Sequence, residues 1–331
     1  VLPLARINPW RSSLTFAGSP PFAWGFGGIL SDTPLTSQDV EIVLSDLVAL
    51  PYQSVRMRPN PLHAPIYDAA RKPSRLQCRR SAAYILDLEG GVEAVWQKRM
   101  RKKTRQHIRN GEKMGLVIEC DTTGRLIPVF HDLYMKSVKR WSRVEHEPLA
   151  LARLRAKMRE PMSKFVHIAR RMGEACRVWV AWKDGEAAAA TIVLIGKNAH
   201  NTRGAMDIDL AGPTYATEVI QWHAIQDAIA AGCRYYNTGE TKPATALAQF
   251  KRGMGSQAYE HDEYLFERLP LVRIDTALRG VVKRALGFKP SGIDESKLSA
   301  ASQDSCSCLN VSNRETDSRY HFILVNLVVH A

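Results

Sequence analysis

The most constraining feature of the sequence is an apolar pattern interrupted once by an Asp-Gly pair. Apolar segments at residues 177–182 and 187–195 flank Asp184 and Gly185. An Asp-Gly pair between two such segments is the strongest short-range signal of a β-hairpin, because both residues tolerate a positive φ. The sequence therefore predicts an antiparallel hairpin in the second half of the chain.

The segments after this hairpin alternate between strand and helix signals. A helix is predicted at about 215–231, and Gly232 follows it as a C-terminal cap. Strands are predicted before and after this helix, and a strand-helix-strand order implies that the two strands are parallel. The remaining elements predicted here are strands at 199–205, 233–238 and 258–266 and a short helix at 244–252. Together these elements indicate a mixed α/β (α+β) fold.

A strongly basic segment precedes this unit. Between Lys98 and Lys113 the chain carries eight Lys or Arg residues. Apolar side chains recur at Trp96, Met100 and Ile108, a spacing that predicts one long helix over 92–114. Helices are also predicted at 37–50, at 127–141 and, with an interruption at Pro161, at 149–172.

Composition limits the possible partners and compartment. The chain has 331 residues, 45% of them hydrophobic, and a formal charge of +13, so it is expected to bury a core and to favour anionic partners. Its longest apolar run, 187–195, is short of the roughly 20 residues that cross a bilayer. Six cysteines without metal-ligand spacing favour a reduced, cytoplasmic protein, and peripheral contact with an anionic membrane stays compatible with the charge.

Three stretches carry a resemblance to a known family. They are the segments 101–116 (RKKTRQHIRNGEKMGL), 130–134 (FHDLY) and 248–255 (AQFKRGMG). Together they resemble the FemAB-like, acetyltransferase-like branch of the GNAT (N-acetyltransferase) superfamily, over about residues 1–269. Members of this branch include aminoacyltransferases of peptidoglycan and proteins linked to exopolysaccharide synthesis.

The resemblance implies a domain organisation. Two GNAT-like halves are expected, each a mixed sheet flanked by helices: residues 1–115, which include the basic connecting helix 92–114, and residues 116–269. The chain opens inside a strand signal without an initiator Met. We therefore expect the first half to begin within the fold, with a truncated N-terminus. Residues 270–331 are expected to form a C-terminal helix and a disordered tail, because beyond about Leu286 the composition shifts to Ser, Asp, Asn and Lys with little periodicity.

The resemblance also implies catalytic residues. Lys251 matches the family's Phe-Lys pair, and the matching lysine of Fem-type enzymes is implicated in stabilising the transition state and in contacting phosphate. Glu240, just beyond a predicted strand end, is a candidate to accept a proton from an ammonium acceptor. The alternatives are a solvated cation for Lys251 and a surface loop acid for Glu240.

The donor is left open between acyl-CoA and aminoacyl-tRNA. Arg105 and Arg109, on one face of the basic helix, are the candidates for holding donor phosphates. Gly212 and Thr214 occupy the place of the GNAT pyrophosphate turn, although that turn lacks its usual basic start and second glycine. No metal ligand set is predicted, because neither HExxH nor paired CxxC occurs.

The resulting hypothesis is an N-acyltransferase that moves an acyl or aminoacyl group from acyl-CoA or aminoacyl-tRNA to an amine. Direct attack, without a covalent enzyme intermediate, is sufficient for this chemistry. The acceptor is expected to be an amine-bearing cell-envelope or exopolysaccharide precursor. Two rivals stay open: a basic nucleic-acid-binding module without catalysis, and a catalytically degenerate family member.

Overall fold

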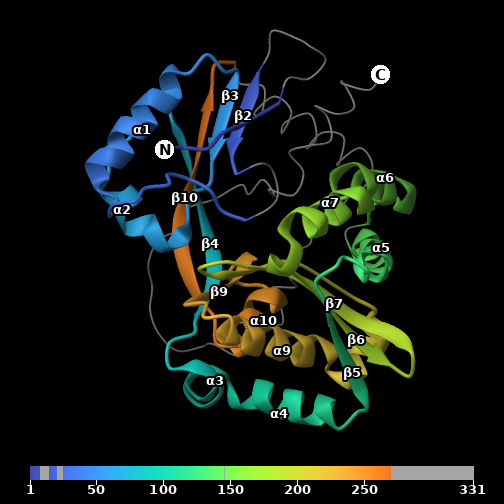
Figure 1. The fold of residues 1–331 in the computed structure, drawn as a ribbon. Helices are drawn as coiled ribbons and strands as arrows, with labels where there is room; N and C mark the ends of the chain where they lie inside the picture. Colours follow the sequence, from blue (N-terminus) through green and yellow to red (C-terminus); the bar gives the residue numbers. More distant parts are fainter. Residues whose placement is uncertain (8–14, 21–24, 145, 270–331) are drawn as a thin grey trace, which may run out of the picture. The chain divides into compact units, whose positions relative to one another are not determined.

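The strands of the described residues form one mixed sheet (Figure 1). The computed structural model describes residues 1–7, 15–20, 25–144 and 146–269. The order across the sheet is β1-β2-β3-β10-β4-β9-β8-β7-β6-β5, parallel at β2–β3 and β8–β9 and antiparallel elsewhere. The strands are β1 Ala5–Ile7, β2 Phe16–Ser19, β3 Ser54–Met57, β4 Gln77–Asp87, β5 Leu116–Asp121, β6 Cys176–Lys183, β7 Glu186–Ile195, β8 Ala199–Met206, β9 Tyr235–Glu240 and β10 Gln257–Glu267.

Helices connect these strands and confirm the predicted mixed α/β class. They are α1 Ser37–Ala49, η2 Pro61–His63, α2 Ala64–Ala69, α3 Gly91–Ala94, η3 Val95–Arg99, α4 Lys102–Glu112, α5 Ile127–Val144, α6 Leu149–Arg159, α7 Met162–Met172, η4 Gly173–Ala175, α8 Ile208–Thr214, α9 Ala216–Ala230 and α10 Ala246–Gly253. The start of α1 is determined by neighbouring residues, because Thr36 and Asp39 form a reciprocal capping box there.

The predicted hairpin and parallel pair are confirmed. β6 and β7 are joined by Asp184 (φ 49°) and Gly185 (φ 83°), the two positive φ values that a tight hairpin turn needs. β8 and β9 run parallel on either side of the connection that contains α9. Gly232 (φ 79°) follows α9 in the left-handed conformation expected of a helix cap.

The single basic helix predicted over 92–114 is wrong. The segment contains the short helix α3, the π-helical turn η3 and then α4, with a break between η3 and α4. Met100 has an extended backbone (φ −75°, ψ 135°) and is 3% exposed. The N–H of Arg101 donates to the Gly253 carbonyl at 3.0 Å, so the helical hydrogen bonding is replaced there by a contact with α10.

The predicted boundary at residues 115/116 divides the sequence but not the sheet. β10 lies between β3 and β4 and pairs with both, although its residues come from the second segment. Val1–Ser137 and Glu160–Arg268 form one compact unit. The two GNAT-like halves therefore stay a prediction, and both segments contribute strands to a single sheet.

Apolar clusters hold this unit together, and two of them join helices to the strands of the sheet. Trp222 and Ile225 of α9 pack with Val193, Tyr236 and Leu86 from three strands of the sheet. In the other cluster, residues of α1 pack against β3 and β10; its members include Val40, Leu44, Leu47, Val55, Met57, Tyr264 and Phe266. Burial of such side chains from helix and sheet supplies most of the stabilisation of a layered α/β unit.

Residues Val138–Arg159 and Leu269–Ala331 are assigned to a second unit. Its described part comprises the end of α5 and all of α6, where the buried Glu147 carboxylate pairs with Arg155 (Oε2 to Nη2, 2.5 Å). The predicted C-terminal helix and disordered tail at 270–331 lie outside the described residues. Among the helices of the described segments, none combines the length and the hydropathy of a membrane span.

Candidate active site at the parting of two parallel strands

The site is built where β8 and β9 separate. These strands pair in parallel only at Ala199 with Tyr236 and at His200 with Asn237. Beyond that point Gly239 (φ 79°) redirects β9, and its N–H is held by the side-chain oxygen of Asn237 at 2.7 Å. Parting strands release backbone polar groups from the ladder, which leaves them available to other partners.

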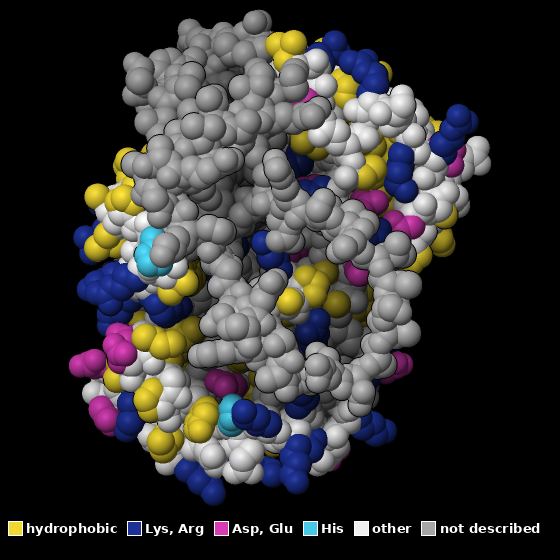
Figure 2. Space-filling view, turned by 180° about the vertical axis from the view of Figure 1, so that it is seen from behind, with side chains coloured by type: hydrophobic (Ala, Val, Ile, Leu, Met, Phe, Trp, Pro, Cys, Tyr) yellow, Lys and Arg dark blue, Asp and Glu magenta, His cyan; other side chains and the backbone are white. Residues whose placement is uncertain are grey.

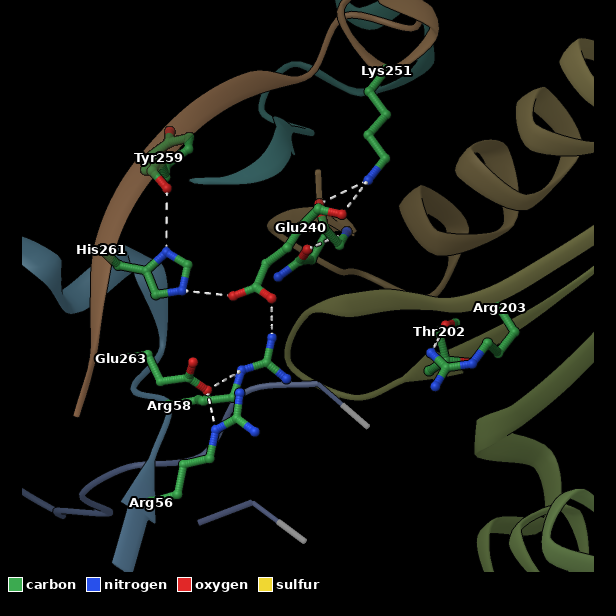
Figure 3. A network of polar contacts seen from close by, with 11 residues as sticks. Arg56, Arg58, Thr202, Arg203, Glu240, Lys251, Tyr259, His261 and Glu263 are labelled. Atoms are coloured by element: carbon green, nitrogen blue, oxygen red, sulfur yellow. Dashed lines mark hydrogen bonds and ion pairs between the residues drawn. The ribbon is translucent and has the colours of Figure 1, made fainter. Parts of the chain in front are cut away.

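Lys251 of α10 supplies one of these partners. Its Nζ donates to the carbonyl oxygens of Gly239 (2.9 Å) and Glu240 (3.3 Å), as Figure 3 shows. The residue is 6% exposed, and its ammonium lies 5.6 Å from the centre of the Tyr84 ring. Burial lowers the pKa of the Lys251 ammonium to about 8, and the Glu240 carboxylate acts in the opposite direction.

Two glycines of the segment 248–255 explain why α10 takes this position. A Cβ on Gly253 would lie 2.7 Å from Thr104 Oγ1, and a Cβ on Gly255 would lie 3.0 Å from Cβ of Arg99 and 3.1 Å from its backbone. Gly255 also has a φ of 95°, which other residues rarely adopt. The basic segment around Arg101 therefore packs directly on the end of the helix that carries Lys251.

Glu240 belongs to a chain of charged groups that runs from β9 to β3 (Figure 3). One carboxylate oxygen lies 3.0 Å from His261 Nε2, and the other accepts from Arg58. Arg58 and Arg56 in turn contact Glu263 Oε1, at 3.4 and 2.5 Å. Because a carboxylate only accepts, His261 Nε2 is the donor in this contact.

The charge of Glu240 is fixed by these contacts. Burial raises the pKa of the carboxyl, but the hydrogen bond with His261 and the charge of Arg58 outweigh burial and leave the pKa below its ordinary value. Both oxygens are engaged, and an acid with a lowered pKa is a weak base. The geometry therefore supports Glu240 as the anionic partner of His261 and Arg58 rather than as the predicted proton acceptor.

His200 is a site residue that sequence reasoning missed. It is the last residue of β8 that pairs with β9, and its ring meets Phe26 edge-on at 6.0 Å. No hydrogen bond joins either ring nitrogen to the described part of the chain. Burial, with the charges of Arg203, Arg58 and Lys251, lowers the pKa of His200 to about 4 against an opposing effect of Glu240, so the imidazole is neutral at pH 7.

Arg105 and Arg109, the predicted phosphate ligands, differ in their environments. Arg105 Nη1 donates to the carbonyl oxygens of Trp96 (2.7 Å), Gln97 (2.9 Å) and Met100 (3.4 Å). It therefore caps the end of η3. Arg109 is exposed, and its guanidinium lies 5.6 Å from the centre of the Trp96 ring. Of these two arginines, Arg109 is the one whose side chain is exposed to solvent.

Gly212 and Thr214 do not form an open turn. Both lie in α8, where the Thr214 hydroxyl donates to the Leu210 carbonyl at 2.6 Å. The start of α9 is closely approached by α4, since a Cβ on Gly111 would meet the Thr214 carbonyl oxygen at 2.8 Å and Val219 at 2.5 Å. The close packing of α4 lies at the junction of α8 and α9, whereas a Cβ on Gly212 would meet no atom within 4 Å, so the assignment of Gly212 and Thr214 to a pyrophosphate stays a prediction. Among the described residues, no group of His, Cys, Asp and Glu could hold a metal ion.

Residues 98–252 match the family model described as "Acetyltransferase (GNAT) domain". The chain carries a GNAT acetyltransferase domain. This domain includes the basic segment, the parting strands and Lys251, whereas Arg58 and His261, the partners of Glu240, lie outside the matched residues. The domain identifies the chain as an acyltransferase and confirms the family resemblance drawn from the sequence.

Comparison with one solved structure supports the fold around the GNAT domain. The crystal structure of FemX is similar over 82% of this chain and 85% of that chain, with a TM-score of 0.55 and 10% sequence identity. A protein of unknown function from Bacteroides thetaiotaomicron (TM-score 0.49, 12% identity, 79% and 84% covered) is also similar. So is the C-terminal domain of a lysylphosphatidylglycerol synthetase from Agrobacterium fabrum (0.47, 14%, 79% and 80%). The search of curated proteins gave no match.

Proposed function

We propose that this GNAT protein transfers an acyl or aminoacyl group to a primary amine at the parting of β8 and β9. The observation that carries the proposal is the buried Lys251 ammonium, which lies at this parting and donates to the Gly239 carbonyl at 2.9 Å. In GNAT-type acyl transfer the reacting carbonyl needs a donor for the charge that develops on its oxygen. Lys251, whose ammonium already donates to the carbonyl oxygens of Gly239 and Glu240, is the side chain that we propose for this role.

The reaction requires one bond to form and one to break. The amine nitrogen uses its lone pair to form a C–N bond with the acyl carbon, and the carbonyl oxygen becomes an oxyanion. Collapse of this intermediate breaks the C–S bond of a thioester or the C–O bond of an aminoacyl ester. The nitrogen loses one proton and the leaving thiolate or alkoxide gains one, so no covalent enzyme intermediate or redox partner is needed.

Lys251 would stabilise the oxyanion in its protonated form. With a pKa of about 8, roughly nine in ten of the Lys251 side chains are charged at pH 7. A charge held in a dry site interacts more strongly with a developing anion than an exposed charge does. Glu240, held by His261 and Arg58, would keep the local charge balanced beside it.

The crowded start of α9 supports an aminoacyl ester over acyl-CoA as the donor. A pyrophosphate bound at a helix N-terminus needs free backbone N–H groups and open space. Here α4 packs against the α8–α9 junction at Gly111, and the Thr214 hydroxyl is used within α8. For the acceptor we propose the class that the family resemblance implies, an amine-bearing cell-envelope or polysaccharide precursor, in a cytoplasmic setting.

The test is transfer activity with defined donors. Acetyl-CoA and a mixed pool of aminoacyl-tRNAs would each be incubated with glucosamine and with a lysine-containing tripeptide, and amide products would be measured by mass spectrometry. Lys251→Ala is expected to lower the rate of transfer by at least about a hundredfold. The control is Lys197→Ala, which removes an exposed lysine from the β7–β8 turn. Equal rates for wild type and Lys251→Ala would contradict the proposal.

A further inference from the structure

Tyr84 of β4 lies opposite an irregularity in β9, at the place where Lys251 contacts that strand. The pairing of β4 with β9 shifts register between Ala83 and Ile85, because β9 contributes one residue more than β4 there. Such a β-bulge bends its strand and takes backbone groups out of the ladder. The Gly239 carbonyl, which accepts from Lys251 at 2.9 Å, belongs to this part of β9.

Tyr84 makes three contacts around the bulge. Its carbonyl oxygen accepts from the Thr238 hydroxyl at 2.8 Å. The centre of its ring lies 5.6 Å from the Lys251 ammonium, and its hydroxyl accepts from Arg252 Nη2 at 3.1 Å. The Tyr84 side chain is fully buried. A single residue of β4 therefore contacts the bulge of β9 and both cations of α10.

The ring of Tyr84 stabilises the cation without using one of its donors. Figure 2 shows Lys and Arg side chains at the surface of one face of the molecule, whereas the Lys251 side chain is buried. Two of the three N–H donors of its ammonium are bonded to the carbonyls of Gly239 and Glu240. No further hydrogen bond joins this ammonium to the described residues, so one donor is left for a reacting oxygen. An aromatic face attracts a cation through its quadrupole, and this attraction takes up no N–H group.

The position of the ring is itself fixed by the fold. Tyr84 lies within β4, which pairs with β10 on one side and with β9 on the other. Its bond with Arg252 joins the ring to the residue that follows Lys251 in α10. A lysine ammonium is carried on a long flexible stem, so an unrestrained ammonium would occupy many positions. A buried ring at this distance restricts the ammonium to the bulge.

We propose that Tyr84 is a positioning residue, whose ring keeps the Lys251 ammonium at the bulge of β9 with one N–H donor free for the reacting carbonyl. The free donor's use rests on the proposed function, whereas the contact between ring and ammonium does not. The alternative is that Tyr84 only fills space in the sheet. A space-filling role requires an apolar side chain of similar volume, but the positioning role requires an aromatic face.

The test measures the pKa of Lys251 in substrate-free protein by NMR with ¹³C-labelled lysine. Tyr84→Leu removes the ring and should lower the pKa of Lys251 by at least about 0.5, because the ring favours the charged form. Tyr84→Phe keeps the ring and should leave that pKa within about 0.2 of the wild-type value. The matched control is Tyr67→Leu, which removes a buried tyrosine from the apolar cluster that contains residues of α1 and should not shift it.

The transfer assay supplies a second measurement. Tyr84→Leu should lower kcat at least about tenfold and leave KM within about threefold, because the ammonium acts in the transition state. The decline of its rate at high pH should also begin at a lower pH than in the wild type. Tyr84→Phe should keep at least about half of the wild-type kcat. Urea unfolding would show which variants fold, and Tyr84→Met replaces Tyr84→Leu if the latter does not.

The outcomes separate this inference from the proposed function. A lowered pKa of Lys251 in Tyr84→Leu, with wild-type values in Tyr84→Phe and Tyr67→Leu, supports the positioning role even if transfer does not depend on Lys251. An unchanged or raised pKa in Tyr84→Leu, or an equal decrease in either of the other variants, would overturn it. Transfer that depends on Lys251 without this shift would leave the proposed function standing and contradict the role of Tyr84.

Discussion

Two basic regions of this protein differ in what surrounds their charge. Lys251 is buried at the parting of β8 and β9, and burial lowers its pKa to about 8. The second region, around α4, consists of exposed cations that form no ion pairs with other described residues: Lys98, Arg101, Lys102, Lys103, Arg109 and Lys113. The two regions come from separate segments of the sequence in which lysines and arginines lie near glycines, yet burial gives their charges opposite properties.

This difference separates two uses of a positive charge. A buried ammonium is poorly solvated, so its charge can be given up near neutral pH and acts strongly on a neighbouring oxyanion. An exposed cation keeps its charge at any physiological pH, but salt screens it, so it contributes long-range attraction rather than chemistry. Gly253 and Gly255 join the two regions by letting the basic segment pack on α10.

Disrupting the packing of the basic segment on α10 should have the largest effect on the free energy of unfolding. Gly255→Ala places a Cβ about 3 Å from Arg99 and forces alanine into a φ of 95°, so we expect a loss of about 3 kcal/mol in the free energy of unfolding. Urea denaturation would measure it. Gly212→Ala is the matched control: its Cβ would meet no atom within 4 Å, and it should change stability by less than about 1 kcal/mol. Equal stabilities for the two variants would refute the packing argument.

Substituting an arginine that is bonded to the backbone and one that is exposed on the same helix, Arg105 and Arg109, sharpens the comparison. Arg105→Gln removes three hydrogen bonds to the carbonyls at the end of η3 and should lower the free energy of unfolding by about 2 kcal/mol. Arg109→Gln, four residues further along the same helix, should lower it by less than about 0.5 kcal/mol, because the Arg109 side chain is exposed. Thermal denaturation of the two variants would separate them. A larger loss of stability in Arg109→Gln would reverse our assignment.

The pH dependence of stability tests the burial of His200. Its pKa is about 4 in the folded chain and about 6.5 when unfolded, so between these values the unfolded chain binds a proton that the folded chain does not. Stability should therefore fall as pH decreases through this range, by about 2 kcal/mol between pH 7 and pH 5. His200→Gln should remove this part of the pH dependence in urea unfolding. An unchanged dependence would show that His200 is solvated.

Much of the fold follows from local sequence signals. The Asp184-Gly185 turn, the cap at Gly232 and the helix at 37–50 depend on neighbouring residues, and each lies close to its predicted place. The basic helix over 92–114 was wrong because its break depends on a distant contact, the bond from the Arg101 N–H to the Gly253 carbonyl. The placement of β10 between β3 and β4 could not be predicted for the same reason, because pairing between strands some 200 residues apart leaves no periodic pattern in the sequence.

The candidate site also contains residues that a sequence motif identifies and residues that only the folded structure brings together. Lys251 could be chosen from a family motif, and the structure gives it a buried environment. His200 and Arg58 carry no motif, because their contacts are to residues that are distant in sequence and are brought close by the folding of the sheet. The sequence offered one indication for His200, because it lies in the predicted strand that precedes the helix joining the parallel pair; it offered none for Arg58. Arg105 shows the converse: a charge that suggested a phosphate ligand is used to cap a turn.

The most direct measurement of the central claim is the pKa of Lys251 by NMR of protein with ¹³C-labelled lysine. The account predicts one ammonium that titrates near pH 8, and the loss of that resonance in Lys251→Arg. The same pH should mark a decline in transfer rate for the wild type, because the protonated form stabilises the oxyanion. If every lysine titrates near its ordinary value of about 10.4, Lys251 is solvated and the account of the site is contradicted.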